Sequence, residues 1–351
     1  MSSYLSRLIT WKHAQRLRKE GYIVAQLHQH SCGYPNKRIG SIDVPGNIKT
    51  TDSYITTHSK ESGVDMVFFT EHHVKGVPWH TKGTTPPNNL LSIEAEVKIP
   101  NAGWVHLAIL GIKDLKFSSY LQDIAEKNDV LMLLKECNNN GALVVACHPF
   151  SKPRPGKFNY ASYFKFIIDN KLPVEINEKR SIIENLAILF IASKYSLPIV
   201  AGKDAHVPGF KGACVAAKTN DVQGLIREIM EHRNYIVFNY AGLFNQSWMM
   251  AKYITGAIKS NPKIRCGPAY IEGSNILNKI IARLNLRFKL KPAKSANRLS
   301  YLKIMNFLKY FAIASAGVFA IIVSYFYFFY SYGLASPYRV IKTLINLPHR
   351  N

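Results

Sequence analysis

Two histidines stand one residue apart in AQLHQHSCG, residues 25–33, directly after a short apolar run. Alternate side chains of an extended chain point to the same side, so His28 and His30 would present two imidazole nitrogens to one ion. An isolated pair of this kind is a weak signal, because 12 histidines are spread along the chain. The residues that follow the other apolar runs must therefore decide whether a metal site is present.

The other apolar runs also lead into residue types that bind metals. In chain order these residues are Glu71, His72 and His73, then Glu94, then His148, then Glu175 and Asn177, then Asp204 and His206. The carboxyl ends of parallel strands meet at one rim of an α/β fold, where these side chains would converge. Imidazoles and carboxylates without a thiolate suit Mn²⁺, Zn²⁺ or Fe²⁺. His106 lies inside an apolar run and is open to two interpretations, a ligand or a hydrogen-bonded core residue.

Strand-like and helix-like segments alternate between residues 21 and 240. The expected strands are 22–27, 65–70, 90–97, 104–112, 142–148, 173–177, 197–202 and 234–239, and the expected helices lie near 51–62, 118–139, 159–169, 181–195 and 221–232. Such alternation predicts parallel strands joined by crossovers, in an α/β layer or barrel.

Positive charge is concentrated at the two ends of the chain. The formal net charge is +23, yet residues 273–351 hold 12 Lys and Arg and no Asp or Glu, and residues 1–20 hold five basic residues and one acid. The middle is therefore a mildly basic globular domain. It shows no alternation of aromatic and basic residues, which argues against an extended nucleic-acid track.

The apolar segment at 310–332 predicts a membrane anchor. No charged residue occurs between Lys309 and Arg339, and a helix of about 20 apolar residues spans a bilayer core. The alternative is a buried core helix. No apolar signal segment opens the chain, and basic residues are more frequent before the span than after it, which predicts a domain facing the cytoplasm. The basic flanks would contact anionic lipid.

These observations divide the chain into five parts. They are a basic N-terminal helix at 1–20, a metal-dependent domain at 21–240, a helical, basic, membrane-proximal region at 241–309, a transmembrane helix at 310–332 and a short basic tail at 333–351. The five cysteines are odd in number and lack CxxC spacing. They favour free thiols and exclude zinc-finger and disulfide frameworks.

The sequence resembles the polymerase and histidinol phosphatase (PHP) superfamily. The resemblance rests on LHQHS, FFTEHH, SIEAEVK, VACHPF, VEIN and GKDAH, in the order and spacing of the superfamily, and it covers about residues 22–207. It implies a distorted (β/α)7 TIM-like barrel with two or three metal ions at its rim. Together with the C-terminal segments, the expected fold is this barrel, a helical region and one transmembrane helix.

The resemblance also implies roles for individual residues. His28 and His30 would bind one metal, Glu94 would bridge metals, and the other ligands would be His72, His148, Asp204 and His206. The sequence departs from the pattern at TEH, at the stretch after the first motif that contains Asp43, at Lys113 and at Lys203. Lys113 cannot bind a metal while it is protonated. These departures leave open a catalytically inactive docking module.

The expected activity is metal-dependent phosphoester hydrolysis, most simply of a phosphomonoester. Two metals about 4 Å apart activate a water, so the expected nucleophile is a metal-bound hydroxide. His206 or His73 would protonate the leaving group. Basic residues would bind the substrate phosphate, namely Lys152, Arg154, Arg180 and Lys203; the stretch around Lys152 is equally open to being a solvated loop. The substrate would be a phosphorylated small molecule or nucleotide, and a nuclease or nucleotide phosphatase is the alternative enzyme.

Overall fold

The computed structural model describes residues 2–30, 63–72, 91–151, 153, 157–178, 180–204, 212–238 and 335–348. The chain forms two compact units, and all of these residues belong to the first, which comprises Met1–Gly33, Asp43–Ala241 and Tyr330–Asn351. The predicted helix at 51–62 and the predicted region at 241–309 lie outside the described residues.

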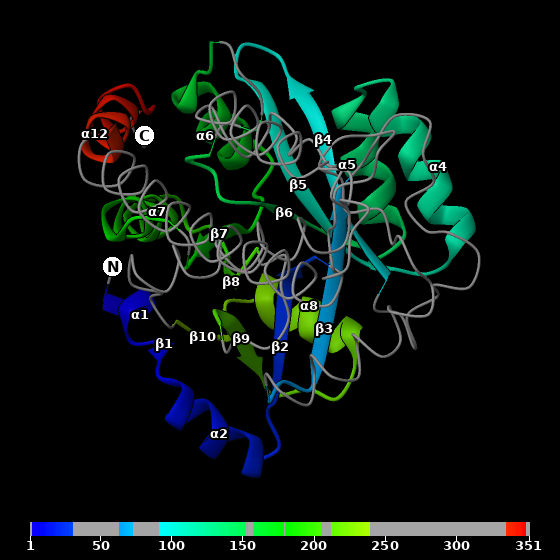
Figure 1. Cartoon of the computed structure of the whole chain (residues 1–351), viewed down its shortest axis with the longest axis vertical. Helices are drawn as coiled ribbons and strands as arrows, with labels where there is room; N and C mark the ends of the chain where they lie inside the picture. The colour runs from blue at the N-terminus through cyan, green and yellow to red at the C-terminus, as the bar shows by residue number, and fades with distance from the viewer. Residues whose placement is uncertain are drawn as a thin grey trace, which may run out of the picture. The chain divides into compact units, whose positions relative to one another are not determined.

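The first unit is built from both strands and helices (Figure 1). In chain order the elements are α1 (Ser2–Leu5), β1 (Leu8–Ile9), α2 (Trp11–Lys19), β2 (Ile23–Gln29), β3 (Met66–His72), β4 (Leu91–Ile99), β5 (Gly103–Ile112), α4 (Leu115–Glu126), α5 (Val130–Asn139), β6 (Leu143–Ala146), α6 (Tyr160–Asp169), β7 (Val174–Asn177), α7 (Ile182–Tyr195), β8 (Ile199–Gly202), β9 (Cys214–Ala217), α8 (Val222–Met230), β10 (Tyr235–Val237) and α12 (Ser336–Ile345).

The strands of the described residues form one curled, half-barrel sheet of ten, in the order β1-β10-β9-β2-β3-β4-β5-β6-β7-β8. The prediction of a (β/α)7 TIM-like barrel is therefore wrong. The sheet is mixed, because β5 runs antiparallel to both of its neighbours and β9 runs antiparallel to β2 and β10. The remaining strands all run in one direction.

A tight turn explains why β5 departs from the predicted parallel pattern. Ile99 of β4 pairs with Gly103 of β5, so only three residues connect the two strands. Asn101 and Gly103 have φ values of 60° and 117°, which a reversal of this kind requires. A parallel connection needs about a dozen residues or more, so β4 and β5 must form an antiparallel hairpin.

Side-chain caps fix where the helices begin. The caps of α2, α4, α5, α6, α7 and α8 are Thr10, Asp114, Asp129, Asn159, Ser181 and Asp221, and each accepts a hydrogen bond from an amide in the first turn. Asp129, preceded by Asn128 at φ 56°, divides the single helix predicted at 118–139 into α4 and α5.

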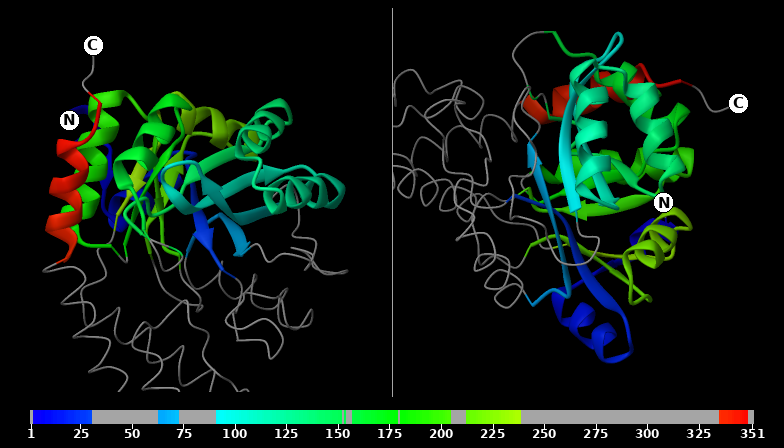
Figure 2. Two further views of the ribbon diagram at one scale, coloured as in Figure 1. Left: turned by 90° about the horizontal axis from the view of Figure 1, so that it is seen from above. Right: turned by 90° about the vertical axis from the view of Figure 1, so that its right-hand side faces the viewer.

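Two hydrophobic clusters cover the two faces of the strands around β2. The larger cluster joins strands to α1, α4, α5, α6, α7, α8 and α12 and includes Ala25 and Leu27. The smaller cluster packs α2 on β2, β3, β9 and β10 and includes Val24. Figure 1 and the right view of Figure 2 show α2 apart from the helices of the larger cluster, and the left view of Figure 2 shows α12 beside α7.

The two ends of the chain differ from the prediction. The basic N-terminal helix expected at 1–20 is divided into α1, β1 and α2, and β1 pairs with β10. The short basic tail expected at 333–351 contains the folded helix α12.

The predicted single-pass membrane localisation, with the domain facing the cytoplasm, is wrong, as the helices of the described residues show; the contact of the basic flanks with lipid stays a prediction. No helix among the described residues is long and apolar enough to cross a membrane. The longest of these helices, α7, has 14 residues, which is about 21 Å against a bilayer core of about 30 Å. The apolar segment at 310–332 lies outside the described residues.

Candidate metal centre

Five of the predicted ligands meet at the ends of parallel strands. His28 and His30 come from the end of β2, His148 follows β6, Asp204 follows β8, and Glu94 lies in β4. Although the barrel prediction is wrong, β2, β4, β6 and β8 all run in the same direction. Their ligands therefore reach the same edge of the sheet. Glu94 does not end its strand as predicted, but it pairs with His72, the last residue of β3, and so lies level with that edge.

The end of β8 closes on the end of β2. The amide of Asp204 donates to the carbonyl of His28 at 2.9 Å, with φ 48° at Asp204. This left-handed conformation is sparsely populated outside glycine, Asn and Asp. On the other side of β2, the register with β3 shifts between Gln26 and Gln29, which is a bulge that includes His28. Bulges of this kind re-aim side chains near functional sites.

The first group of candidate ligands is formed by His28, His30 and Asp204, whose ligand atoms all lie within 4.8 Å of one another. Oδ1 of Asp204 lies 3.3 Å from Nε2 of His30 and 3.9 Å from Nε2 of His28. The ring centroids of the two histidines are 5.3 Å apart. The two histidines thus share one side, as their spacing predicts.

The second group is formed by Glu94, His106 and His148, again within 4.8 Å of one another. Oε1 of Glu94 lies 2.8 Å from Nδ1 of His106 and 3.2 Å from Nε2 of His148. His106 belongs to β5, and the hairpin brings it beside β4, where it pairs with Glu96. The structure therefore favours the first of the two interpretations of His106.

Glu94 links the two groups. Its Oε1 is also 3.6 Å from Nε2 of His28, and its Oε2 is 3.5 Å from Nε2 of His30. Glu94 and His30 are 0% exposed and His28 is 1% exposed. Donor atoms that each lie about 2.1 Å from one ion are separated from one another by about 3.0–3.5 Å. Three of the six separations between donor atoms lie in that range and the other three are 2.8, 3.6 and 3.9 Å, so the residues fit a metal after small adjustments.

Glu175 contacts one member of each group through its carboxylate. Its Oε1 lies 2.8 Å from Nδ1 of His28, and its Oε2 accepts the amide hydrogen of His148 at 2.7 Å. With Nδ1 used in this way, Nε2 of His28 is buried and makes no hydrogen bond to the described residues. Such an imidazole nitrogen fits a metal ligand, and the carboxylate behind it sets the orientation of the ring.

The charges of these groups shift one another's pKa values. Burial opposes protonation of His28, but the carboxylate of Glu175, together with Cys147 and Glu94, holds the pKa of His28 well above its usual value. Burial would raise the pKa of Glu175, yet the nearby imidazoles lower it overall. Burial lowers the pKa of His148, and the positive charge of Arg180 acts in the same direction.

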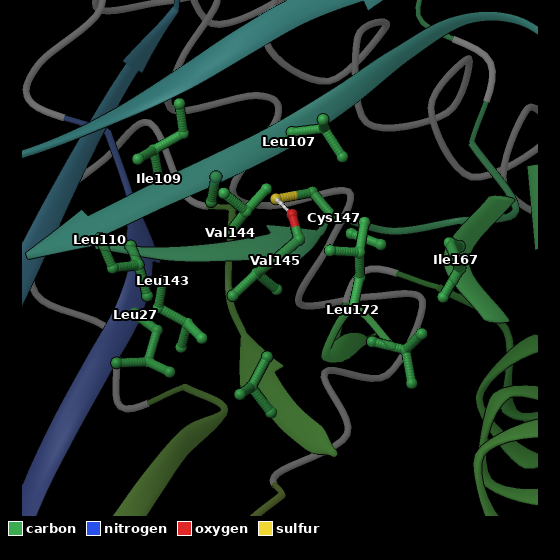
Figure 3. Close-up of a cluster of buried hydrophobic side chains, with 14 of the residues drawn as sticks. Leu27, Leu107, Ile109, Leu110, Leu143, Val144, Val145, Cys147, Ile167 and Leu172 are labelled. Atoms are coloured by element: carbon green, nitrogen blue, oxygen red, sulfur yellow. Dashed lines mark hydrogen bonds between the residues drawn. The ribbon is translucent and has the colours of Figure 1, made fainter. Parts of the chain in front are cut away.

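Cys147 borders the site, but its thiol belongs to the core. Figure 3 shows its sulfur among apolar side chains, directed at the carbonyl of Val145, at 3.8 Å. Burial raises the pKa of Cys147 to about 12. Its position within 4.8 Å of ligand atoms of His28 and Glu94 therefore adds a neutral thiol and leaves the donor set one of nitrogen and oxygen.

The remaining predicted site residues are distributed differently. Arg180 donates from Nη2 to Oγ of Ser151 at 2.8 Å, and Ser151 donates its amide hydrogen to the carbonyl of His148 at 2.7 Å. Lys203 is fully buried. Its side chain packs so closely against Gly212 that a Cβ added to that glycine would lie 2.4 Å from Cδ of Lys203. The others lie outside the described residues, namely Lys152, Arg154, His73, His206 and the side chain of His72.

Lys113 lies away from the candidate ligands. Its Nζ donates to Oδ1 of Asn140 at 2.7 Å and stands over the ring of Phe117. A docking module in which Lys113 neutralises Glu94 or Asp204 therefore has no support in this contact.

The comparisons with known proteins do not assign a family. No protein-family model matches the sequence, and no curated protein matches it. The crystal structure of PsfC from Pseudomonas syringae PB-5123 aligns with 69% of this chain and 100% of its own chain, at 14% identity and a TM-score of 0.43. A similarity of this size carries no argument, so the function rests on the candidate ligands.

Proposed function

We propose that this chain is a metal-dependent phosphoesterase of the PHP type, acting on phosphomonoesters. The observation that carries the proposal is the position of Glu94, whose Oε1 lies within 3.6 Å of ring nitrogens of His28, His106 and His148 and whose Oε2 lies 3.5 Å from Nε2 of His30. Contact of one carboxylate with histidines of both groups supports a role for Glu94 in bridging two divalent ions. Nitrogen and oxygen donors suit Mn²⁺, Zn²⁺ or Fe²⁺.

In the proposed mechanism some residues would hold the ions and others would hold the substrate. Bound divalent ions would acidify a water and neutralise charge on phosphoryl oxygens. Glu175 orients His28 and fixes the amide of His148. Arg180 provides positive charge close enough to His148 to act on its pKa. A guanidinium in that position is suited to a phosphate ester, which it can hold through two parallel hydrogen bonds.

The test is metal-dependent turnover by the purified full chain. After chelation, reloading with Mn²⁺, Zn²⁺ or Fe²⁺ should restore hydrolysis of p-nitrophenyl phosphate. Glu94→Gln and His30→Ala should lower kcat/KM by about 100-fold or more, because a metal contributes several kcal/mol to the transition state. The exposed His13, changed to Ala, is the matched control.

Two results would overturn the proposal. One is activity that survives both chelation and Glu94→Gln, and the other is a metal-loaded protein without turnover on any phosphate ester. Parallel assays with a mononucleotide and an oligonucleotide decide the substrate class. Faster turnover of the oligonucleotide than of either small substrate would replace the phosphomonoesterase by a nuclease.

A further inference from the structure

The helix α12 is bound to the beginning of α7 by polar contacts. Oγ of Ser336 lies 2.5 Å from Oγ of Ser181, and both serines are buried. Arg339 donates to Oε1 of Glu184 from Nη2 at 2.6 Å and from Nε at 3.2 Å. Figures 1 and 2 both show α12 alongside α7. A segment 155 residues further along the chain thus contacts the first turn of α7.

Glu184 gives this contact a structural consequence. Its Oε2 accepts the amide hydrogen of Ser181 at 3.4 Å, and its own amide donates to Oγ of Ser181 at 3.1 Å. This capping box starts α7. The Glu184 side chain is 0% exposed, and a buried carboxylate is costly unless it is paired. The guanidinium of Arg339 supplies such pairing, so it stabilises the charged cap that defines the start of α7.

The start of α7 in turn holds the loop that follows β7. The side chain of Asn185 makes two hydrogen bonds to the backbone of Asn177. Its Oδ1 accepts the amide hydrogen of Asn177 at 3.0 Å, and its Nδ2 donates to the carbonyl of Asn177 at 2.9 Å. Arg180 donates its amide hydrogen to the carbonyl of Asn177 at 3.0 Å. Through its guanidinium it reaches Ser151, which is bonded to the backbone of His148. The contacts therefore run without a gap from α12 to the candidate metal centre.

We propose that Arg339 is a positioning residue for Arg180. By pairing with Glu184 it fixes the first turn of α7, and that turn holds Asn177, to whose carbonyl the amide of Arg180 is hydrogen-bonded. The role of Arg180 in holding phosphate rests on the proposed function, whereas the ordering of the loop by α12 does not. Affinity for a phosphate group then depends on a helix that contains none of the candidate ligands.

The experiment compares substitutions on α12 in the full, metal-loaded chain. Arg339→Ala removes the pair, Arg339→Lys restores a positive charge, and Lys342→Ala removes an exposed charge from the same helix as a control. Hydrogen exchange of the amides in 177–186 reports the order of the loop. Arg339→Ala should exchange about tenfold faster there, the size of one charge-assisted hydrogen-bonded pair. Lys342→Ala should match the wild type, and Arg339→Lys should fall between.

Kinetics then separate positioning from general stability. Arg339→Ala should raise the KM for p-nitrophenyl phosphate, and the inhibition constant of inorganic phosphate, by about fivefold to tenfold. The value of kcat and the number of bound metals should stay within twofold of the wild type. Arg339→Lys should recover part of the loss. If Arg339→Ala does not fold, Ser336→Ala removes only a buried hydroxyl and repeats the test.

Each outcome decides the proposal. Faster exchange with an unchanged KM and phosphate affinity means that α12 only stabilises α7, and unchanged exchange means that Arg339 does not order the loop. Either result overturns the positioning role. A wild-type chain that neither binds inorganic phosphate nor hydrolyses a phosphate ester removes the proposed function instead. The exchange comparison then still decides whether Arg339 orders the loop that carries Arg180.

Discussion

The Nδ1 atom of His28 lies 2.8 Å from Oε1 of Glu175, although 147 residues separate the two in the chain. The second oxygen of the same carboxylate accepts the amide hydrogen of His148 at 2.7 Å. One buried carboxylate therefore fixes a ring from β2 and a backbone segment after β6. It leaves Nε2 of His28 directed at the candidate ligands.

Glu175→Gln should weaken metal binding by about 10-fold to 100-fold, the usual effect of losing the carboxylate behind a ligating histidine. The amide keeps the shape of the side chain but removes the charge that orients the imidazole of His28. Competition against a chromophoric chelator measures the affinity. Asp169→Asn, at an exposed acid on α6 that pairs with Lys165, is the control. Equal affinities for the two variants would mean that Glu175 does not orient the site.

Each of the two groups of ligands should lose its metal independently of the other. His30→Ala removes a ligand from the group with His28 and Asp204, and His106→Ala removes one from the group with Glu94 and His148. Each variant should lose about one bound metal per chain and retain the other, while Glu94→Gln should weaken both. Elemental analysis of dialysed protein gives the stoichiometry. A wild-type content of metal in His106→Ala would return that residue to the hydrogen-bonded core.

Gly202→Ala should disturb both the fold and the metal centre. A Cβ at this position would lie 1.5 Å from Oε1 of Glu175 and 2.9 Å from Cβ of His28. Neither side chain can move away easily, because the two are joined by a hydrogen bond. We expect a loss of about 3 kcal/mol in the free energy of unfolding, together with weaker metal binding. Urea unfolding and chelator competition measure the two effects.

Gly21→Ala separates crowding from backbone strain. Gly21 has φ 85° but nothing within 4 Å of its added Cβ, so this variant should lose only about 1 kcal/mol. Its metal affinity should equal that of the wild type. Similar losses in both variants would show that the close approach of Gly202 to Glu175 is not what the fold requires.

Much of the sheet, and the convergence of the ligands, could be predicted from local sequence. Apolar runs identified β2 to β8 and β10 because buried strands are short, apolar and bounded by polar or glycine residues. His28, His148 and Asp204 follow such runs, and their strands share one direction. That relationship depends on the direction of the strands rather than on a closed barrel, so it survives the error in the fold.

The rest depends on contacts that one-dimensional patterns do not contain. The three-residue turn before Gly103 decides that β5 is antiparallel, and this in turn brings His106 to Glu94. The turn was readable as a hairpin signal, but a histidine inside an apolar strand gives no sign of which carboxylate it will meet. The support of His28 by Glu175 joins residues 147 positions apart, and no spacing rule predicts it.

A pH-dependent contribution to stability should arise at His232, away from the metal centre. Nδ1 of His232 lies 3.3 Å from the hydroxyl of Tyr4, and Arg7 donates to its carbonyl at 2.9 Å. Burial, followed by the positive charge of Arg7, lowers the pKa of His232 from its usual 6.5. Well above pH 6.5 the histidine is neutral in both the folded and the unfolded chain.

As the pH falls below 6.5, the unfolded chain takes up the proton first, so the contribution of His232 to stability should be lost progressively. His232→Asn should remove this dependence, and asparagine tolerates the φ of 60° at this position. Urea unfolding of the chelated protein between about pH 5 and pH 8 measures the slope of stability against pH, with His13→Asn as the control. The wild type should lose more stability on acidification than His232→Asn. An equal slope in the two proteins would mean that burial of His232 between Tyr4 and Arg7 does not disfavour its charge.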